Sequence, residues 1–369
     1  MNWTEYTLGE LLSYEQPTNY IVESTTYNDK FLTPVLTAGK TFILGYTNEK
    51  NGIYSDLPVI IFDDFTTASR YVNFPFKVKS SAMKILTPNT ELVIPKFIYY
   101  RMQAIQFDSS THKRYWIQQY SKIKVAVPPI LVQEQIVSRI EELFSKLDKG
   151  VETLQTIKQQ LAVYQQVILK EEFAETTKYA PFGTIMQSRL GKMLDKKKNT
   201  GVLQRYLRNI NVRWFSFDLS DIQQMKIEPS EHEKYSIEPG DLIICEGGEP
   251  GRCAVWESSE TVYYQKALHR VRFCADKNPK YYMYYLWYAA QCGKLSSYFT
   301  GTGIKHLTGQ SLERVPVPVI ERENQDSVVE RIETHLSVCK SIEMTICTAL
   351  MQADAMRQSI LKQAFEGEI

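Results

Sequence analysis

Apolar residues recur at steps of three and four along two long stretches of the chain. In residues 133–173 the apolar stripe begins at Ile136, and in residues 325–365 it begins at Val328. Spacing of this kind, sustained over a whole long stretch, is typical of a coiled coil. A helix of about 40 residues is ~60 Å long, which is too long to bury its stripe on one small domain. The pattern therefore predicts two long helices that pair, and packing of each stripe on its own domain is the alternative.

The two helical stretches are copies of each other. They align without a gap at an offset of 192 positions, and 14 of 41 residues are identical, including Glu141 with Glu333 and Phe173 with Phe365. Because solenoid repeats are much shorter, this period indicates one domain-plus-helix unit made twice. Gly150 lies inside the first stretch and predicts a local bend, since glycine weakens a helix.

The segments outside the helical stretches are globular and repeat more faintly. Strand-like runs such as Leu57–Phe62 and Leu242–Cys245 lie near helix-like stretches at residues 95–106 and 279–292. They do not alternate as βαβ units, so the pattern indicates an α+β fold with an internal pseudo-twofold duplication. The expected segments are a globular domain at residues 1–127, a helix at residues 128–176, a second globular domain at residues 177–318 and a second helix at residues 319–369.

Charge is distributed unevenly, although the net charge of the 369 residues is only +1. Residues 1–127 and 174–316 hold 33 Lys and Arg against 26 Asp and Glu, whereas the helical stretches with their flanks hold 10 against 16. Mildly basic globular parts are compatible with a polyanionic partner. The chain has no apolar run near the about 18 residues of a membrane helix, and its first residues have no signal-peptide pattern. We therefore expect a cytoplasmic protein without a membrane partner.

Motifs for catalysis or cofactor binding are missing from the sequence. Residues 37–41 resemble the end of a phosphate-binding loop, but Pro34 stands where that loop needs its first glycine. The six cysteines show no C-x-x-C spacing and the histidines no ligand spacing. We therefore expect a non-catalytic chain that itself holds no cofactor and no metal.

Several segments resemble one known family, the DNA specificity (S) subunits of type I restriction–modification systems. The resemblance covers nearly the whole chain. Its most specific parts are Pro128-Pro129 with the helical stretch that follows, and the C-terminal residues 357–369, RQSILKQAFEGEI. Residues 240–256, GDLIICEGGEPGRCAVW, and residues 301–319, GTGIKHLTGQSLERVPVPV, look like parts of the second recognition domain of such subunits. The first globular part is similar in its order of segments but more diverged.

The resemblance implies two target recognition domains that each read one half of a split, asymmetric sequence in double-stranded DNA. It also implies that the long helices form an antiparallel coiled coil, which sets the spacing and docks two modification (methyltransferase) subunits. S-adenosylmethionine would then bind to those partners, and ATP and Mg to restriction (endonuclease/translocase) subunits. Two alternatives are a coiled-coil adaptor that binds only proteins, and the recognition module of a type II-like restriction enzyme.

Candidate DNA contacts are basic side chains for phosphates, and amide or guanidinium groups for base edges. Polar and apolar residues alternate in residues 205–213, RYLRNINVR, which predicts a strand with one base-reading face; the solvated side of an ordinary strand is the alternative. That face carries Arg205, Asn209, Asn211 and Arg213. The other candidates in the second domain are Lys196, Lys197, Lys198, Arg208, Lys266, His269, Lys305 and His306. The candidates in the first domain are Lys40, Asn48, Lys50, Arg70, Tyr71 and Lys84.

Overall fold

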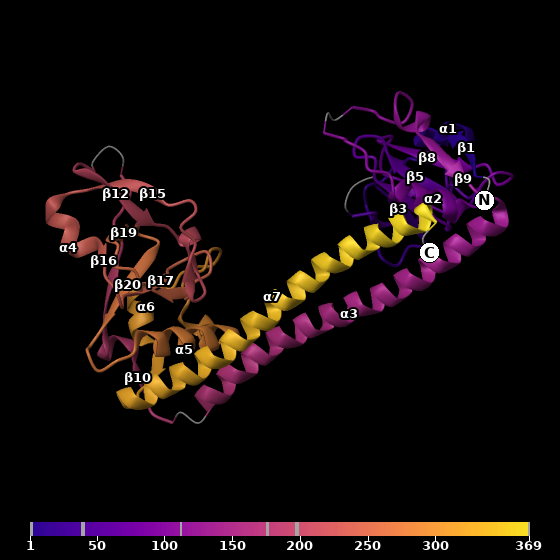
Figure 1. Cartoon of the computed structure of the whole chain (residues 1–369). Coiled ribbons are helices and arrows are strands. Elements are labelled where there is room, and N and C mark those ends of the chain that lie inside the picture. The colour runs from indigo at the N-terminus through magenta and orange to yellow at the C-terminus, as the bar shows by residue number, and fades with distance from the viewer. Residues whose placement is uncertain (1–2, 38–40, 111–112, 175–176, 196–198, 368–369) are drawn as a thin grey trace. The chain divides into compact units, whose positions relative to one another are not determined.

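The computed structural model describes residues 3–37, 41–110, 113–174, 177–195 and 199–367. They form two compact units (Figure 1). Unit 1 comprises Met1–Leu154 and Cys347–Ile369, and unit 2 comprises Gln155–Ile346. The long helices α3 (Ile130–Ala174) and α7 (Arg322–Glu366) each contribute one part to both units.

Unit 1 contains an antiparallel four-stranded sheet in the order β2-β8-β5-β6 and a three-stranded sheet in the order β4-β3-β7. In the smaller sheet β3 and β7 are parallel. The first and last strands of the globular part, β1 and β9, pair antiparallel and so close it beside the long helix. The elements are β1 (Thr4–Thr7), α1 (Leu8–Leu11), β2 (Leu12–Glu15), η1 (Pro17–Tyr20), β3 (Thr33–Leu36), β4 (Ile43–Thr47), β5 (Val59–Asp63), β6 (Ser69–Val72), β7 (Lys77–Val78), β8 (Met83–Pro88), α2 (Pro95–Gln103), η2 (Tyr120–Lys122) and β9 (Lys124–Val127).

Side chains of the four-stranded sheet are buried on both faces. Phe62 and Leu86 lie in one apolar cluster with Phe97 of α2, whereas the alternate residues Ile61 and Ile85 lie in a second cluster with residues of the smaller sheet. This explains why β5 reads as a continuous apolar run, because a strand covered on both sides has no solvent face.

Unit 2 repeats this plan. Its four-stranded antiparallel sheet has the order β11-β20-β17-β18, a second sheet has the order β15-β12-β19-β16, and β10 pairs with β21 as β1 does with β9. Its elements are β10 (Tyr179–Pro181), η3 (Phe182–Thr184), β11 (Met186–Leu190), β12 (Val202–Leu207), η4 (Asn209–Asn211), β13 (Val212–Arg213), β14 (Ser216–Phe217), β15 (Gln223–Ile227), η5 (Pro229–Glu231), α4 (His232–Tyr235), β16 (Ser236–Ile237), β17 (Leu242–Cys245), β18 (Cys253–Val255), β19 (Val262–Tyr264), β20 (Leu268–Phe273), α5 (Pro279–Gln291), η6 (Ser296–Tyr298), α6 (Gly309–Arg314) and β21 (Pro316–Pro318).

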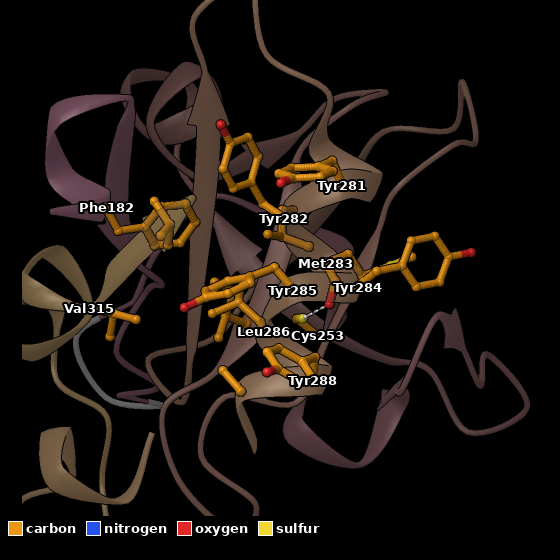
Figure 2. Packing of buried hydrophobic residues seen from close by; sticks show 14 of the residues in the cluster. Phe182, Cys253, Tyr281, Tyr282, Met283, Tyr284, Tyr285, Leu286, Tyr288 and Val315 are labelled. Atoms are coloured by element: carbon orange, nitrogen blue, oxygen red, sulfur yellow. Dashed lines mark hydrogen bonds between the residues drawn. The ribbon is translucent and has the colours of Figure 1, made fainter. Parts of the chain in front are cut away.

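Helix α5 lies in the core of unit 2 as α2 does in unit 1. Figure 2 shows Tyr282 and Tyr285 of α5 on the same side as Phe182 and Val315. The Sγ of Cys253 donates to the Met283 carbonyl oxygen over 3.9 Å. The second sheet of unit 2 has one strand more than that of unit 1, namely β16. The equivalent order of the other strands, the parallel pair and the core helix in both units confirm the duplication that the sequence predicts.

The long helices pack against each other in both units with opposite directions (Figure 1). In unit 1 the guanidinium of Arg357, near the end of α7, lies 4.4 Å from the ring centroid of Phe144, near the start of α3. In unit 2 Arg331, near the start of α7, pairs at 2.6 Å with Glu172, near the end of α3. The predicted antiparallel pairing is therefore present within each unit.

Each apolar stripe also packs on a globular part, so the alternative arrangement contributes too. Ile140 lies in the core cluster around α2, and Leu169 and Phe173 lie in that around α5. Gly150 does not end the helix, because α3 continues through it as a single helix of 45 residues. Within the described residues, none of the helices combines the length and apolar character that a membrane crossing requires.

Candidate nucleic-acid interface

One group of polar side chains in unit 2 surrounds the turn between β17 and β18. The side-chain amide of Asn209 donates from Nδ2 to the Gly247 carbonyl oxygen at 2.9 Å, and Arg252 donates from Nη2 to the carbonyl oxygen of Asn209 at 3.0 Å. A Cβ on Gly247 would lie 3.1 Å from Nδ1 of His306, which places that imidazole directly beside the turn. We call this group, with the exposed Lys305 next to it, the β17–β18 loop cluster.

Glycine is required in this turn for two separate reasons. Gly247 is buried against His306, and Gly248 is exposed with a φ of +75°, which L side chains rarely adopt. The carboxylate of Glu249 then accepts hydrogen bonds from Trp214 Nε1 and Arg252 Nη1, both at 2.7 Å, and holds the turn against β18. Lys305 is exposed beside this turn, whereas the Asn209 amide and the Arg252 guanidinium are held by protein groups.

A second group lies in a cleft of about 440 Å³ on the outer part of the four-stranded sheet of unit 2. In the pairing of β11 with β20, Gln187 stands opposite Arg272 and Arg189 opposite Arg270. Directly opposed residues of an antiparallel pair point to the same face, so these four side chains form one polar surface. We call it the basic cleft; its lining residues are Gln187, Ser188, Arg189, Ser230, Glu233, Lys234, Arg270 and Arg272.

Two of the four cations in the basic cleft are held by protein groups. Arg270 is buried and donates from Nη1 to the Ser236 carbonyl oxygen. Arg272 forms two hydrogen bonds to Asp241, at 2.8 and 3.1 Å, and this hydrogen bonding raises the pKa of its guanidinium. Arg189 and Lys234 are exposed and form no ion pair with the described residues, so their charge is available to a phosphate.

Comparison with known proteins identifies the chain's relatives. Residues 1–162 match the family model of the type I restriction modification DNA specificity domain. The specificity subunit of the type I restriction enzyme EcoR124I/EcoR124II from Escherichia coli is 43% identical over 174 residues, which cover 44% of this chain and 43% of that protein. Over the matched residues the chain is similar to the specificity subunits of type I restriction–modification systems.

Other relatives extend the similarity. The EcoKI specificity subunit from Escherichia coli strain K12 is 23% identical over 271 residues, covering 68% of this chain and 58% of that protein. The chain thus spans about half the length of these curated relatives.

Solved structures share the fold over the full chain. One is a chain from a structure concerned with complex assembly and conformational transition of a type I R-M system, with a TM-score of 0.75, 15% identity and coverage of 100% of this chain and 98% of that one. The HsdS subunit from Thermoanaerobacter tengcongensis gives a TM-score of 0.56, 15% identity and coverage of 100% and 97%.

The predicted base-reading strand of unit 2 is not one strand. β12 ends at Leu207, and Asn209 falls in the 3-10 helix η4. Arg205 on β12 is therefore separated from Asn209, and it is ion-paired with Glu260. The alternation of polar and apolar residues predicts one strand, but the short 3-10 helix η4 connects β12 to β13 instead.

Two further predicted contacts in unit 2 lie in the protein interior. Asn211 is 1% exposed, accepts a hydrogen bond from the Arg208 amide at 2.9 Å and donates to the Asp218 carbonyl oxygen at 2.9 Å. His269 is also 1% exposed and hydrogen-bonds through Nε2 to the Leu307 carbonyl oxygen at 3.0 Å. We withdraw both residues from the interface, because a buried, bonded side chain cannot reach DNA without local unfolding.

The remaining predicted residues of unit 2 are partly gathered and partly scattered. Asn209, Lys305 and His306 belong to the β17–β18 loop cluster. Arg208 pairs with Asp221 at 2.6 Å and Arg213 with Asp218 at 3.4 Å, so both arginines carry a local counter-charge. Lys266 is exposed on the turn before β20. Lys196, Lys197 and Lys198 lie outside the described residues.

In unit 1 the predicted residues do not form one cluster. Asn48 and Lys50 are exposed in the segment after β4, whereas Arg70 and Tyr71 lie on β6 beside α2, where the Tyr71 and Tyr99 ring centroids are 5.9 Å apart. Lys40 lies outside the described residues. The prediction that Lys84 contacts DNA is wrong.

Lys84 is only 2% exposed, because it points into the core cluster of unit 1 and its Nζ lies 3.6 Å from Oδ2 of Asp64. It is withdrawn from the interface like His269.

None of the residues that line the basic cleft was predicted from the sequence, and neither was Arg252 of the β17–β18 loop cluster. The strand segments MQSRL and LHRVRF carry alternating polar residues, which is a usable local signal. What the sequence does not contain is the pairing of β11 with β20, about 80 residues later. Among the described residues, His, Cys, Asp and Glu side chains form no group suited to a metal ion.

Proposed function

We propose that this chain is the DNA-recognition subunit of a type I restriction–modification complex, in which each unit reads one half of a bipartite asymmetric target. The observation that carries the proposal is the duplication of one complete domain-plus-helix unit within a chain that is similar to known specificity subunits. A split target requires two readers of the same kind, and this chain contains two.

In unit 2 the two candidate surfaces divide the work of recognition. Arg189, Lys234 and Lys305 supply charge to phosphates, which positions the domain without reading sequence. Gln187 is exposed and carries a side-chain amide, which pairs with an adenine edge in the major groove. A wrong base pair at such a contact costs roughly 1–3 kcal/mol.

The catalytic work belongs to partner subunits in this proposal. The exposed faces of α3 and α7 dock two modification subunits, which bind S-adenosylmethionine, and restriction subunits supply ATP- and Mg-dependent cleavage. The protein itself then acts as a non-enzymatic guide. The helices are acidic, and this charge disfavours their own contact with DNA.

Modified-base sequencing tests the proposal. The chain is assembled with its modification subunits, the complex methylates a random DNA library, and the methylated sites are read. We expect one motif made of two short half-sites separated by a gap of fixed length. Methylation without sequence preference contradicts the proposal and favours a protein-only adaptor.

Variants of the basic cleft test the site itself. Arg189→Ala and Lys234→Ala should each weaken binding of the assembled complex on all duplexes alike, and each should reduce the slope of log affinity against log salt by about one. Lys226→Ala, an exposed lysine of β15 outside the cleft, is the matched control. An unchanged salt slope in both cleft variants would exclude this surface.

A further inference from the structure

A fully buried glutamine joins three backbone segments at the start of α3. Gln133 is 0% exposed. Its Oε1 accepts a hydrogen bond from the amide of Ile94, at 2.8 Å, and its Nε2 donates to the carbonyl oxygens of Leu92 and Pro128, at 3.0 and 2.9 Å. Ile94 is the N-cap residue of α2. One side chain therefore ties the start of α2 and the connector after β9 to the first turn of the long helix.

The same junction recurs 192 positions later. Gln325 is also 0% exposed, accepts a hydrogen bond from the Asn278 amide at 2.8 Å and donates to the Ile320 carbonyl oxygen at 2.8 Å. Asn278 is the N-cap residue of α5. Both glutamines thus bond the N-cap amide of the core helix and a carbonyl of the connector before the long helix, and Gln133 has the Leu92 carbonyl in addition.

A second contact lies eight residues further along each long helix. In unit 1 Glu141 of α3 pairs with Lys96 of α2 and accepts a hydrogen bond from the Tyr100 hydroxyl at 3.4 Å. Eight residues are two turns and about 12 Å of helix, on roughly the same face. The glutamine and the glutamate therefore hold α2 at two separate points.

Unit 2 repeats this contact too. Glu333 of α7 pairs with Lys280 of α5 at 2.8 Å, and Tyr284 hydrogen-bonds to the same carboxylate. Lys280 makes a further ion pair with Glu257 at 2.8 Å, and the hydrogen bonds from Lys280 to these carboxylates raise the pKa of its ammonium.

We propose that these contacts form a doubled clamp, which fixes the angle of each recognition domain on its long helix and thereby selects the gap between the half-sites. The clamp comprises Gln133, Glu141 and Lys96 in unit 1, and Gln325, Glu333 and Lys280 in unit 2. This inference rests on the proposed function, since only a bipartite reader has a gap to select.

A geometric argument links the clamp to the gap. One contact point leaves a domain able to pivot on the helix, whereas two points about 12 Å apart define its direction. A domain of about 100 residues extends roughly 20 Å from its attachment, so a turn of ~10° moves its outer surface by ~3.5 Å. This displacement equals about one base-pair step of DNA. A loosened clamp therefore changes which gap is accepted and leaves the half-site letters unchanged.

Methylation of targets with altered gaps tests the clamp. The assembled complex is offered the wild-type half-sites with the gap unchanged, one base pair shorter or one base pair longer. Gln133→Leu removes all three hydrogen bonds, and Lys96→Glu and Glu141→Lys each break the ion pair. Each variant should raise methylation of the altered gaps relative to the natural gap by about tenfold or more. The half-exposed charge variants keep the test open if the buried Gln133→Leu chain does not fold.

Rescue and a stability control separate positioning from general softening. The double variant Lys96→Glu with Glu141→Lys restores an ion pair and should return the strict gap preference. Val72→Ala, in the core away from the clamp, should lower stability and leave the preference strict. An unchanged gap preference in the clamp variants, or equal loosening by Val72→Ala, overturns the inference while the proposed function stands. A wild-type complex without any bipartite motif overturns the proposed function itself.

Discussion

Lys84 and His269 occupy the same position of the duplicated sheet, one in each unit. Lys84 on β8 stands opposite Phe62 of β5, and His269 on β20 stands opposite Ile244 of β17. Both are buried, and each meets a polar group in the interior: the carboxylate of Asp64 for Lys84, and the Leu307 carbonyl oxygen for His269. The fold thus keeps one polar, hydrogen-bonding residue at this point of each unit.

Lys84 and His269 differ in their charge and in how the protein interior accommodates them. Lys84 brings a full charge into the core, and Asp64 compensates it; Oδ1 of the same carboxylate also accepts a hydrogen bond from the Trp116 amide at 2.8 Å. His269 brings a neutral ring. Its Nε2 donates to the Leu307 carbonyl oxygen, and its buried Nδ1 has no hydrogen-bond partner among the described residues.

Burial of His269 makes the stability of unit 2 depend on pH. Burial lowers the pKa of the imidazole below its ordinary value of 6.5, because a proton on Nδ1 would find no acceptor. The unfolded chain therefore takes up this proton first as the pH falls. The stabilising contribution is fully present above about pH 6.5 and is lost as the pH falls toward the folded-state pKa. From pH 7.5 to 5.5 the loss should reach at most about 1.4 kcal/mol.

Hydrogen exchange of the amides in β17 and β20, corrected for intrinsic rates, measures this loss within unit 2. His269→Gln removes the titrating ring and should flatten the dependence between pH 7.5 and 5.5. Lys266→Gln, an exposed change on the adjoining turn, should retain the wild-type dependence. A dependence that persists in His269→Gln would assign it to another group.

At the scale of elements, the long helices are defined by local sequence, whereas the sheets are not. The three-four stripe predicts helices at residues 133–173 and 325–365, and the structure extends each by only a few residues, to α3 and α7. A helix is made by contacts between near neighbours, so its signal is local. The basic cleft depends on β11 meeting β20 across a long stretch of chain, and no local pattern encodes that pairing.

The predicted interface is wrong at Lys84 and His269 for a related reason, because burial of a polar residue is not encoded locally. A lysine or histidine within an apolar run, as in MKILTP and LHRVRF, looks like a surface cation until its neighbours are known. The sequence therefore predicts DNA contacts at Lys84 and His269, and it gives no reason to select Arg189, which faces the cleft from an edge strand. Asn209, Lys305 and His306 were recognised individually, but only the fold brings them to one turn.

Gly150 permits a direct test of the helix as an element. It lies inside unit 1 on the exposed side of α3, and a Cβ placed there meets nothing within 4 Å. Glycine in a helix interior costs roughly 0.5–1 kcal/mol relative to alanine. Gly150→Ala should therefore raise the free energy of unfolding of unit 1 by about that amount, as measured by urea denaturation with hydrogen exchange of α3 amides.

The aligned position of the second helix supplies the comparison. Ile342 occupies it in α7, so Ile342→Gly should lower stability by an amount similar to the gain from Gly150→Ala. A loss of stability in Gly150→Ala would mean that α3 needs a flexible point there. Methylation by the assembled Gly150→Ala complex distinguishes a functional need for that flexibility from a purely structural one.

At the scale of the whole molecule, the duplication gives each unit its own globular part with its own attachment to the long helices. Each globular part closes on itself through its first and last strands, β1 with β9 and β10 with β21. Each is also held by both long helices: in unit 1 by Gln133 of α3 and by Phe365 of α7, whose ring centroid lies 5.5 Å from that of Phe97. Each globular part is thus a closed domain with a defined attachment to both long helices.

Exchange of one globular part should therefore change only one half-site of the recognised sequence. Residues 1–127 are replaced by the corresponding domain of a known specificity subunit. The donor domain is chosen to carry a lysine and an aromatic residue where this chain has Lys96 and Phe97, so that the contacts with α3 and α7 are retained. Modified-base sequencing should then report one new half-site, one unchanged half-site and the original gap. The two retained features follow from unit 2 and the clamp being untouched. A change in both half-sites would mean that the two units do not read DNA independently. A changed gap with one preserved half-site would mean that the surface of the domain, and not its attachment to the helix, sets the gap between the half-sites.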